Sequence, residues 1–354
     1  MKESGSIRML QPKEHGGFES HPREFAETVM RMASLNPSAG WVHGIVGVHP
    51  WQLAFADPRV QQEVWGEDQD TWLASPYMPG GMCVPVDGGY KFSGRWSFSS
   101  GTDHCDWAFL GAMACNPDGS VQMPPRMLHV IIRGPTTGSL TTRGTSWVCA
   151  GRVEGRRRRG RVRAGLPRHG LRRGHRRHRR PQVRPHRVAV PDAVVEHVPA
   201  RDHLGHHRHL RGPAAPRQRV PARAHQPPGT AVKDDPYTLF AIGEATAKLR
   251  SARDSLLANV DRMWDIVDSG RTPTFEQRAL GRETQVNAAW QAVTAVDQVY
   301  ARCGGNALRM DKPMQRFWRD AHAGLHHAIH VPGTVYHAAT LSGLGVDRRV
   351  RCGR

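Results

Sequence analysis

The chain has 354 residues, of which 38% are hydrophobic, and its 50 Lys and Arg against 31 Asp and Glu give a formal net charge of +19. It contains no signal peptide, no lipidation motif and no apolar run near the ~18 residues of a membrane span, so we expect a soluble, cytoplasmic protein with no membrane partner. Its six Cys form no CxxC pair, which argues against a disulfide framework and a zinc site.

Residues 1–70 predict a helical region. Apolar residues recur at the spacing of one helix face, and an Asn-Pro-Ser break at 36–38 divides the pattern in two. The apolar positions are Phe25, Val29, Met32, Val42, Ile45 and Val46.

Residues 71–132 predict strands and turns. Apolar residues alternate on both sides of Asp87-Gly88-Gly89, which is a hairpin signal. The stretches 107–110 and 127–132 have the composition of further buried strands. The alternating positions of the hairpin are Val84, Val86, Tyr90 and Phe92.

Residues 151–228 differ in composition from the rest of the chain. They contain 22 Arg and 10 His but no Lys, Ile, Phe, Tyr, Trp, Met, Ser or Asn. With four acidic residues the segment carries a charge of +18, so the remaining 28 basic and 27 acidic groups leave the rest of the chain close to neutral. A pI near 10.8 would ordinarily indicate a nucleic-acid or membrane-surface partner, but here the whole excess lies in one segment.

A shift of reading frame explains this composition. Most of the missing residues need A- or T-rich codons, whereas Arg, Gly, Ala and Pro are what GC-rich DNA yields in the wrong frame. Moving plausible codons by one base turns 153–169 into a strand-like run of β-branched residues, and 192–227 into a buried segment followed by an amphipathic helix. We therefore interpret 133–228 as an out-of-frame segment, disordered as written, and 348–354 as a doubtful tail.

Residues 229–347 predict a bundle of long helices. Asp235-Pro236 caps an apolar stripe that ends at Asp268-Ser269-Gly270, and Thr274 with Gln277 forms a capping box for a second helix that stops at Gly304-Gly305. Two more helices are expected, from about 313 to 330 and from about 334 to 344. With the helix recovered from the shifted frame, they make an antiparallel bundle.

The order of helical part, central β-domain and C-terminal helix bundle predicts an α+β fold. Four strings stand out in the in-frame residues: Arg8–Lys13 with Gly16-Gly17, Gly47–Trp51, Gly94–Gly101 with Asp103-His104, and Gln315–His322. In these strings the chain resembles the oxygenase component of two-component flavin-dependent aromatic monooxygenases, which have the acyl-CoA dehydrogenase fold. The nearest resemblances are to the 3-hydroxy-9,10-secoandrostatrienedione 4-hydroxylase of steroid breakdown and the 4-hydroxyphenylacetate 3-hydroxylase oxygenase.

The resemblance implies a function. It implies that a phenolic or aromatic substrate is hydroxylated through a flavin C4a-hydroperoxide, with reduced FMN or FAD supplied by a separate reductase. It also implies a homotetramer and an internal start at Met1, because the family's chains begin earlier. Since 133–228 replaces a strand and a helix that the family places around the flavin, we expect the literal chain to be inactive.

The resemblance places the flavin beside the string that contains Trp96 and Gly101. The hydroxyl of Ser99 or Ser100 would lie near flavin N5, where the wider fold uses a Thr; the alternative is a pair of turn serines before Gly101. Trp96 and Phe98 would form a wall of the flavin site, although aromatics at such positions are more often ordinary core.

A Pro/Gly loop, 77–81, is the other candidate cofactor contact. Tyr77 and Met78 begin this loop, which could approach the flavin by its backbone. The alternative is a simple connection between strands.

Two His are the candidate catalytic and substrate-binding residues. Hydroxylating a phenol requires a base with a pKa near 7 to remove the phenolic proton, and His is the suitable residue. His322, beside Arg319 and Asp320, is the candidate base, and His49 with Trp51 is the candidate contact for the substrate. A structural role is the alternative for each His.

Three His at 322, 326 and 330 are spaced four apart, which would place them on one helix face. No second cluster of carboxylates accompanies them, so we expect a helix-face or interface role and no metal.

Two other function classes compete with the leading one. An acyl-CoA dehydrogenase proper would need a Glu base, and none lies among the C-terminal motifs. A nucleic-acid-binding protein would use the Arg/His segment, but an RNA-binding arm usually mixes Lys, Ser and aromatics with its Arg.

Overall fold

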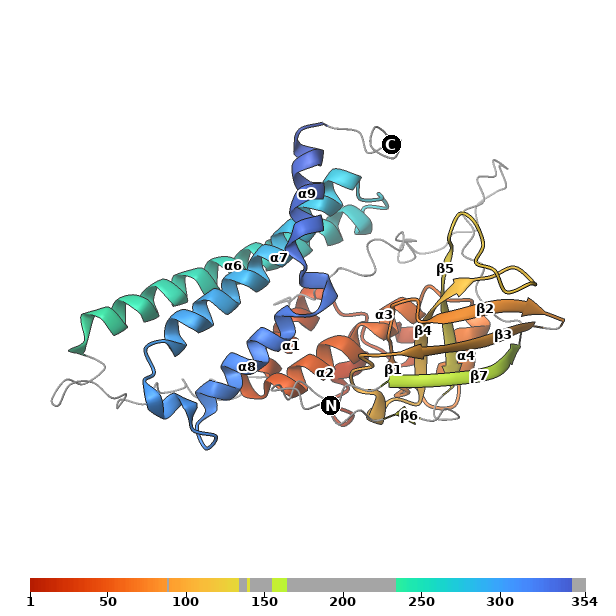
Figure 1. The fold of residues 1–354 in the computed structure, drawn as a ribbon, viewed down its shortest axis with the longest axis horizontal. Coiled ribbons are helices and arrows are strands. Elements are labelled where there is room, and N and C mark those ends of the chain that lie inside the picture. Colours follow the sequence, from red (N-terminus) through yellow and green to blue (C-terminus); the bar gives the residue numbers. More distant parts are fainter. Residues whose placement is uncertain (88, 134–138, 141–154, 164–233, 346–354) are drawn as a thin grey trace. The chain divides into compact units, whose positions relative to one another are not determined.

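The computed structural model describes residues 1–87, 89–133, 139–140, 155–163 and 234–345 (Figure 1). These residues fall into two compact units, one made of 1–20 with 29–163 and the other of 21–28 with 234–345. Helix α1 (Pro22–Leu35) therefore contributes its first seven residues to the second unit and the rest to the first.

Short helices occupy the N-terminal part of the first unit, as the apolar spacing predicts. They are η1 (Ser6–Arg8), η2 (Lys13–His15), α2 (Pro37–Gly47), α3 (His49–Leu53) and α4 (Pro58–Trp65). The predicted break at 36–38 is the start of α2, because the Asn36 side chain accepts the Ala39 N–H at 3.2 Å and Pro37 occupies the first helical position.

The same unit contains a mixed sheet. Its strands are β1 (Leu73–Ala74), β2 (Gly81–Val86), β3 (Gly89–Trp96), β4 (Trp107–Ala114), β5 (Met127–Arg133), β6 (Ser139–Leu140) and β7 (Gly155–Arg163). The order is β1-β4-β2-β3-β7-β6, and β5 pairs with β4. The predicted hairpin is confirmed, since β2 and β3 are antiparallel with Val84 opposite Lys91.

Two apolar clusters support this sheet. Phe92, Trp96 and Leu110 lie in one cluster, with the Phe92 and Trp96 ring centroids 5.2 Å apart. The other joins α3 and α4 to β1 and β4. Its buried members are Leu53, Val64, Trp65, Leu73, Trp107 and Phe109.

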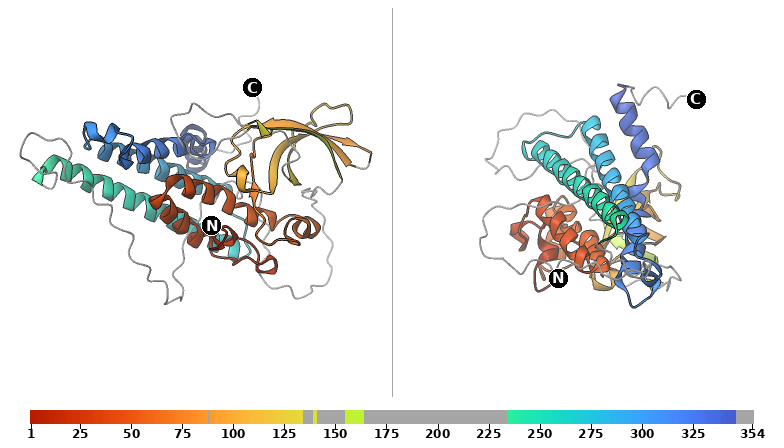
Figure 2. Two further views of the ribbon diagram at one scale, coloured as in Figure 1. Left: turned by 90° about the horizontal axis from the view of Figure 1, so that it is seen from below. Right: turned by 90° about the vertical axis from the view of Figure 1, so that its left-hand side faces the viewer.

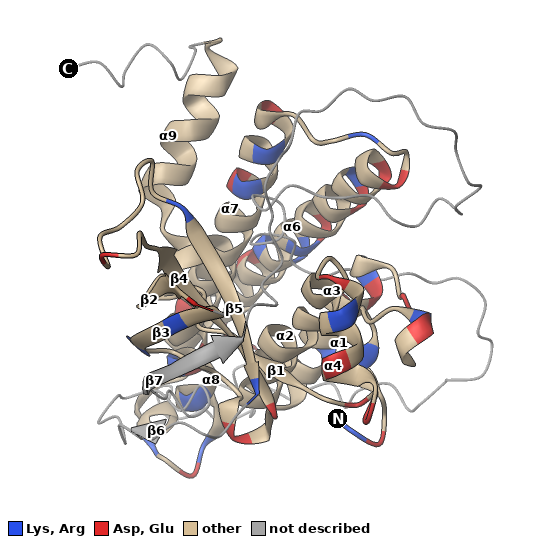
Figure 3. Ribbon diagram, turned by 90° about the vertical axis from the view of Figure 1, so that its right-hand side faces the viewer, with Lys and Arg blue, Asp and Glu red and all other residues tan. Residues whose placement is uncertain are grey.

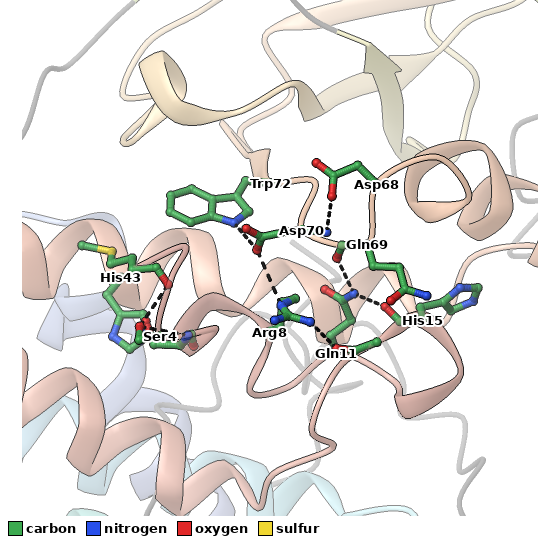
Figure 4. Close-up of polar contacts among 12 residues, drawn as sticks. Ser4, Arg8, Gln11, His15, His43, Asp68, Gln69, Asp70 and Trp72 are labelled. Carbon is green, nitrogen blue, oxygen red and sulfur yellow. Dashed lines mark hydrogen bonds and ion pairs between the residues drawn. The ribbon is translucent and has the colours of Figure 1, made fainter.

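Polar contacts fix the N-terminal segment beside the start of β1 (Figure 4). Gln11 is 1% exposed, and its amide donates to the carbonyl of Gln69 at 2.8 Å. Asp70 lies 3.6 Å from the Arg8 guanidinium and accepts the indole N–H of Trp72 at 3.0 Å. The string that begins at Arg8 therefore has a structural role, because it holds the residues that lead into β1.

The second unit is a set of helices. They are α6 (Pro236–Asp268), α7 (Phe275–Tyr300), η5 (Gly305–Leu308), α8 (Pro313–Leu325), η6 (Ala328–His330) and α9 (Pro332–Gly343). Helices α6 and α7 lie side by side and run in opposite directions (Figures 1 and 2). The predicted cap at Asp235 and the capping box of Thr274 with Gln277 are both present.

Polar contacts join the helices within this unit. The buried Asn259 amide on α6 donates to the carbonyl of Gly281 on α7 at 3.1 Å. The first turns of α1 join α6 through the pairs Arg23–Asp261 at 3.0 Å and Glu27–Arg253 at 2.7 Å.

One predicted helix is too long. Helix α8 ends at Leu325, with His326 as its C-cap, and His330 lies in the separate helix η6, so the expectation of three His on one helix face is wrong. The His327 side chain accepts the Ile329 N–H at 3.3 Å and so offers the backbone an alternative to the helix. Pro332, which has no N–H to donate, begins α9.

Part of the segment for which we expected disorder has regular structure. Strands β6 and β7 lie within 133–228, and β7 pairs with β3 over its full length, from Gly89 opposite Arg163 to Trp96 opposite Arg156. The helix expected from the shifted frame and the tail 348–354 lie outside the described residues.

The distribution of charges along the described helices agrees with the nearly neutral composition of the chain outside residues 151–228. Basic and acidic residues are interspersed along the described helices (Figure 3). No helix among the described residues is long and apolar enough to span a membrane.

Candidate functional site

His49 begins helix α3 and lies inside the first unit. Only 1% of this residue is exposed, and its ring packs 5.8 Å from that of Phe109 on β4. The apolar cluster around Leu53 and Leu73 fixes α3 against the sheet, so the backbone that carries the imidazole is held in place.

Four polar side chains are linked to His49, directly or through one another, by hydrogen bonds. The Ser75 hydroxyl lies 2.6 Å from His49 Nε2, and the Tyr77 hydroxyl lies 2.9 Å from His49 Nδ1. Tyr77 also donates to Gln52 Oε1 at 2.5 Å, and Gln52 Nε2 lies 3.1 Å from His129 Nδ1. Elements α3 and β5 and the loop after β1 therefore meet at one buried polar network, which we call the His49 network.

Burial keeps the His49 imidazole neutral. Removal of the ring from water, with a smaller contribution from the charge of His129, lowers the pKa of His49 to about 3. A neutral imidazole has one donor and one acceptor nitrogen, so the ring can hold a hydroxyl group by either role.

The loop that carries Tyr77 is fixed to strand β4 at Gly111. The Gly111 N–H donates to the carbonyl of Pro76 at 3.1 Å. A Cβ at position 111 would lie 2.0 Å from the carbonyl oxygen of Tyr77, so only glycine fits. Met78, the next residue of the loop, is 72% exposed.

The residues after β3 form the second feature of this unit. Phe98 has φ 62°, which is uncommon for a residue with a side chain, and it is 72% exposed. The buried Ser99 hydroxyl pairs with that of Thr102 at 2.9 Å, whereas the Ser100 oxygen accepts the Trp41 indole N–H at 3.0 Å. Gly101 follows with φ 76°.

The second unit carries the other candidate group, on α8. His322 Nδ1 lies 2.8 Å from the carbonyl of Trp318, one turn earlier, and its Nε2 lies 3.4 Å from a carboxylate oxygen of Asp297 on α7. The same carboxylate oxygen accepts the Trp318 indole N–H at 2.7 Å. Because a carbonyl only accepts, His322 carries its proton on Nδ1 and presents a lone pair at Nε2 when neutral.

Two further site candidates, Arg319 and Asp320, lie close to His322 in the sequence of α8. Arg319 donates to the carbonyl of Gln315 at 3.4 Å. Asp320 is 9% exposed, and burial raises the pKa of its carboxyl, while the charges of Arg316 and Arg319 act in the opposite direction.

Comparison with known proteins identifies the family. A family model described as the C-terminal domain of acyl-CoA dehydrogenase matches residues 214–332. A pigment production hydroxylase of Rhodococcus erythropolis is 62% identical over 368 residues, covering 98% of this chain and 88% of the relative. The oxygenase subunit HsaA of a flavin-dependent monooxygenase of Mycobacterium tuberculosis is 31% identical over 350 residues, covering 94% and 84%.

The chain belongs to the oxygenase components of flavin-dependent monooxygenases that act on aromatic substrates.

Solved structures agree with the fold of this oxygenase. The crystal structure of the 3-HSA hydroxylase from Rhodococcus sp. RHA1 has a TM-score of 0.77 at 27% identity, covering 98% of this chain and 89% of that one. XiaF from Streptomyces, solved with FADH2 and glycerol, has a TM-score of 0.81 at 19% identity, covering 98% and 87%. The predicted acyl-CoA dehydrogenase-like α+β fold is confirmed.

The family match also bears on the competing functions and on the out-of-frame segment. The similar proteins are hydroxylases and monooxygenases, which favours the leading function over the dehydrogenase and nucleic-acid alternatives. The family model begins to match at residue 214, inside 133–228, so the end of that segment at 228 stays a prediction.

The predicted site residues of the oxygenase divide between the two units. His49 and Tyr77 come together in the His49 network, while the Trp51 ring packs against Phe55 at 5.4 Å. Trp96 is 2% exposed and donates to the carbonyl of Gly111 at 2.7 Å, a position that favours the core role over a wall of the flavin site.

Several site residues were not predicted from the sequence. Ser75, Gln52 and His129 reach His49 only through tertiary contacts, and so does Asp297 in reaching His322. Gln52 alone has a spacing signal, because it lies three residues after His49 on α3. No spacing rule connects the other positions, and polar type alone is too common to single them out. Among the described residues there is no group of three or more His, Cys, Asp or Glu that could hold a metal ion.

Proposed function

We propose that this oxygenase hydroxylates a phenol, with His322 as the base that removes the phenolic proton. The observation that carries the proposal is the hydrogen bond from His322 Nδ1 to the carbonyl of Trp318, which leaves Nε2 as a proton acceptor of fixed direction. Removing the phenolic proton pushes electron density into the ring, which makes the ring carbon a better nucleophile. Asp297, 3.4 Å from Nε2, would stabilise the imidazolium that forms.

His49 is proposed to contact a hydroxyl group of the substrate, with Arg319, Asp320 and Trp51 as further substrate contacts. The support for His49 is its neutral, buried imidazole beside the Ser75 hydroxyl. The substrate class follows from the relatives: the names of similar proteins include a 3-HSA hydroxylase and hydroxylases of p-hydroxyphenylacetate and resorcinol. We therefore propose a phenolic compound of the aromatic or steroid-breakdown type.

The residues around Phe98 fit a reduced flavin. An exposed aromatic ring on a strained backbone offers a face for a flat heterocycle, and residues in the left-handed region cost about 1–2 kcal/mol, which points to a functional constraint. The Ser100 hydroxyl accepts from Trp41 and so keeps its own hydrogen for donation near flavin N5, and Ser99 keeps its hydrogen too where Thr102 is the donor in their pair. Gly101, Tyr77 and Met78 are the other proposed contacts.

Reduced flavin bound there would supply activated dioxygen. The chain holds no G-x-G-x-x-G unit for a nicotinamide cofactor, so we propose that a separate reductase delivers the flavin. Reduced FAD is tested first and reduced FMN second, because FADH2 appears in the names of a resorcinol hydroxylase relative and of the XiaF structure.

We also propose that copies of the chain assemble as a homotetramer. Large apolar side chains are exposed on the first turns of α6, where Tyr237 is 73% and Phe240 71% exposed, and such surfaces support burial against another chain. Light scattering on the purified protein measures the assembly.

Two proteins test the function: the literal chain and the product of a frame-corrected gene. Each is given reduced FAD or FMN by an unrelated flavin reductase, a panel of phenols and isotopically labelled dioxygen. We expect the frame-corrected protein to yield a labelled catechol and the literal chain to yield none. Absence of labelled product from the corrected protein would overturn the proposed function, and product from the literal chain would overturn its inactivity.

The base is tested in the corrected protein by His322→Gln. We expect a fall in kcat of about 10²-fold or more, because general-base catalysis contributes roughly 10²–10⁴-fold. Thr284→Ser, at an exposed position on α7, is the control for an unrelated substitution in the same unit. An unchanged kcat in His322→Gln would remove His322 from the mechanism.

A further inference from the structure

The His49 network has a direction that its donors and acceptors determine. Tyr77 has one hydroxyl hydrogen, and it donates this hydrogen to Gln52 Oε1, which only accepts. The contact of 2.9 Å between Tyr77 and His49 Nδ1 must then be a donation from His49 to the phenolic oxygen.

The rest of the chain of hydrogen bonds follows. A neutral His49 with its hydrogen on Nδ1 has a lone pair on Nε2, so the Ser75 hydroxyl donates to Nε2 across 2.6 Å. At the other end, Gln52 Nε2 donates to His129 Nδ1 across 3.1 Å. Each of the five side chains thus has a role that is compatible with its neighbours.

We propose that Tyr77, Gln52 and His129 are positioning residues that hold His49 in its Nδ1–H tautomer, so that Ser75 donates its hydrogen to Nε2 and the Ser75 oxygen is left as the acceptor for the substrate's hydroxyl group. The inference rests on the proposed function for its substrate, but the tautomer is a property of the chain alone. The inference uses only the Tyr77 side chain, and the proposed contact of Tyr77 with the flavin is made by the backbone of its loop.

Gln52 is the residue that gives the network its direction. An amide has an acceptor at one end and a donor at the other, so turning it over would reverse every hydrogen bond in the chain and move the His49 hydrogen to Nε2. Ser75 would then accept from His49, and the pair would present a donor to the substrate.

Two substitutions of Gln52 are expected to give opposite tautomers of His49. Gln52→Glu keeps an acceptor for the Tyr77 hydroxyl, so His49 keeps its hydrogen on Nδ1. Gln52→Leu removes that acceptor, which releases the Tyr77 hydrogen to bond His49 Nδ1 and shifts the His49 hydrogen to Nε2. Tyr90→Phe, on β3 in the same unit, is the control for an unrelated substitution in this unit.

The measurement is the long-range ¹H–¹⁵N spectrum of His-labelled full chain at pH 7.5, with the His49 signals identified by their loss in His49→Gln. We expect Nδ1–H in the wild type, Gln52→Glu and Tyr90→Phe, and Nε2–H in Gln52→Leu. A wild-type His49 with its hydrogen on Nε2, or a Gln52→Leu spectrum identical to the wild type, would overturn the inference.

Kinetics separate this inference from the proposed function. In the hydroxylating protein we expect Gln52→Leu to raise KM for the phenol by about fivefold to tenfold with kcat within about twofold, the size of one hydrogen bond. Correct tautomers in a protein that hydroxylates no phenol would overturn the proposed function and the substrate half of the inference. Hydroxylation with an unchanged KM in Gln52→Leu would overturn the inference alone.

Discussion

Acidification is expected to destabilise the first unit through His49. The pKa of His49 is lowered to about 3 by burial, whereas the unfolded chain has the ordinary value of 6.5. As pH falls below 6.5, His49 is protonated in the unfolded state and stays neutral in the folded state. The free energy of unfolding is therefore highest above pH 6.5 and decreases as pH falls towards 3. The loss between pH 7.5 and pH 5 is about 2 kcal/mol from this one side chain.

The assay is the free energy of unfolding in urea at half-unit steps from pH 7.5 to 5, for the wild type and for His49→Gln. The pKa values of His43, His327 and His330 are also lowered by partial or full burial, and these residues contribute to both curves and cancel in the difference. We expect the wild type to lose about 2 kcal/mol more than the variant over this range. Parallel curves for the two proteins would refute the burial of a neutral His49.

Three further outcomes are expected. Gly111→Ala should destabilise the fold by about 2 kcal/mol or more in urea unfolding, because its Cβ would overlap the carbonyl of Tyr77; wild-type stability would contradict the close approach. Thr274→Ala should cost about 1 kcal/mol in the same assay and Thr274→Ser much less, since only the hydroxyl accepts the Gln277 N–H; equal losses would argue against the cap. The nucleotide sequence across codons 130–232 should encode, in shifted frames, a β-branched strand followed by an amphipathic helix, and the out-of-frame interpretation fails if it does not.

Features that depend on neighbouring residues were predictable from the sequence. The caps at Asn36, Asp235 and Thr274 each join groups two or three residues apart, so the local pattern contains the whole interaction. The hairpin of β2 and β3 was predictable for the same reason, because a short turn and alternating apolar residues specify the pairing.

The end of α8 was not predicted because the sequence signals that mark it are weak. The nearest Pro lies at 332, seven residues after the helix ends, and the His327 side chain that competes with the backbone belongs to a type that is common inside helices.

The His49 network could not be predicted from the sequence. Gln52 and His129 are separated by 77 residues, and their contact exists only because α3 packs against the sheet that contains β5. Tyr77 was assigned to the cofactor from the Pro/Gly composition of its loop, since nothing local shows that its hydroxyl points to α3. The general rule is that residue type predicts which chemistry is available, whereas partners across the fold determine which role each group takes.

The presence of strand β7 does not decide between the literal and the shifted reading frame. Ladder hydrogen bonds are made by backbone groups, so the edge of β3 that β7 covers could be paired by almost any segment without Pro. The literal sequence of β7 contains six Arg, whereas the shifted frame gives β-branched residues, which suit a sheet better. Pairing with β3 is therefore expected under both readings, and the strand position agrees with the shifted frame as well as with the literal one. What differs between the two readings is the charge: the literal reading gives residues 151–228 a charge of +18, although the remaining residues are nearly neutral.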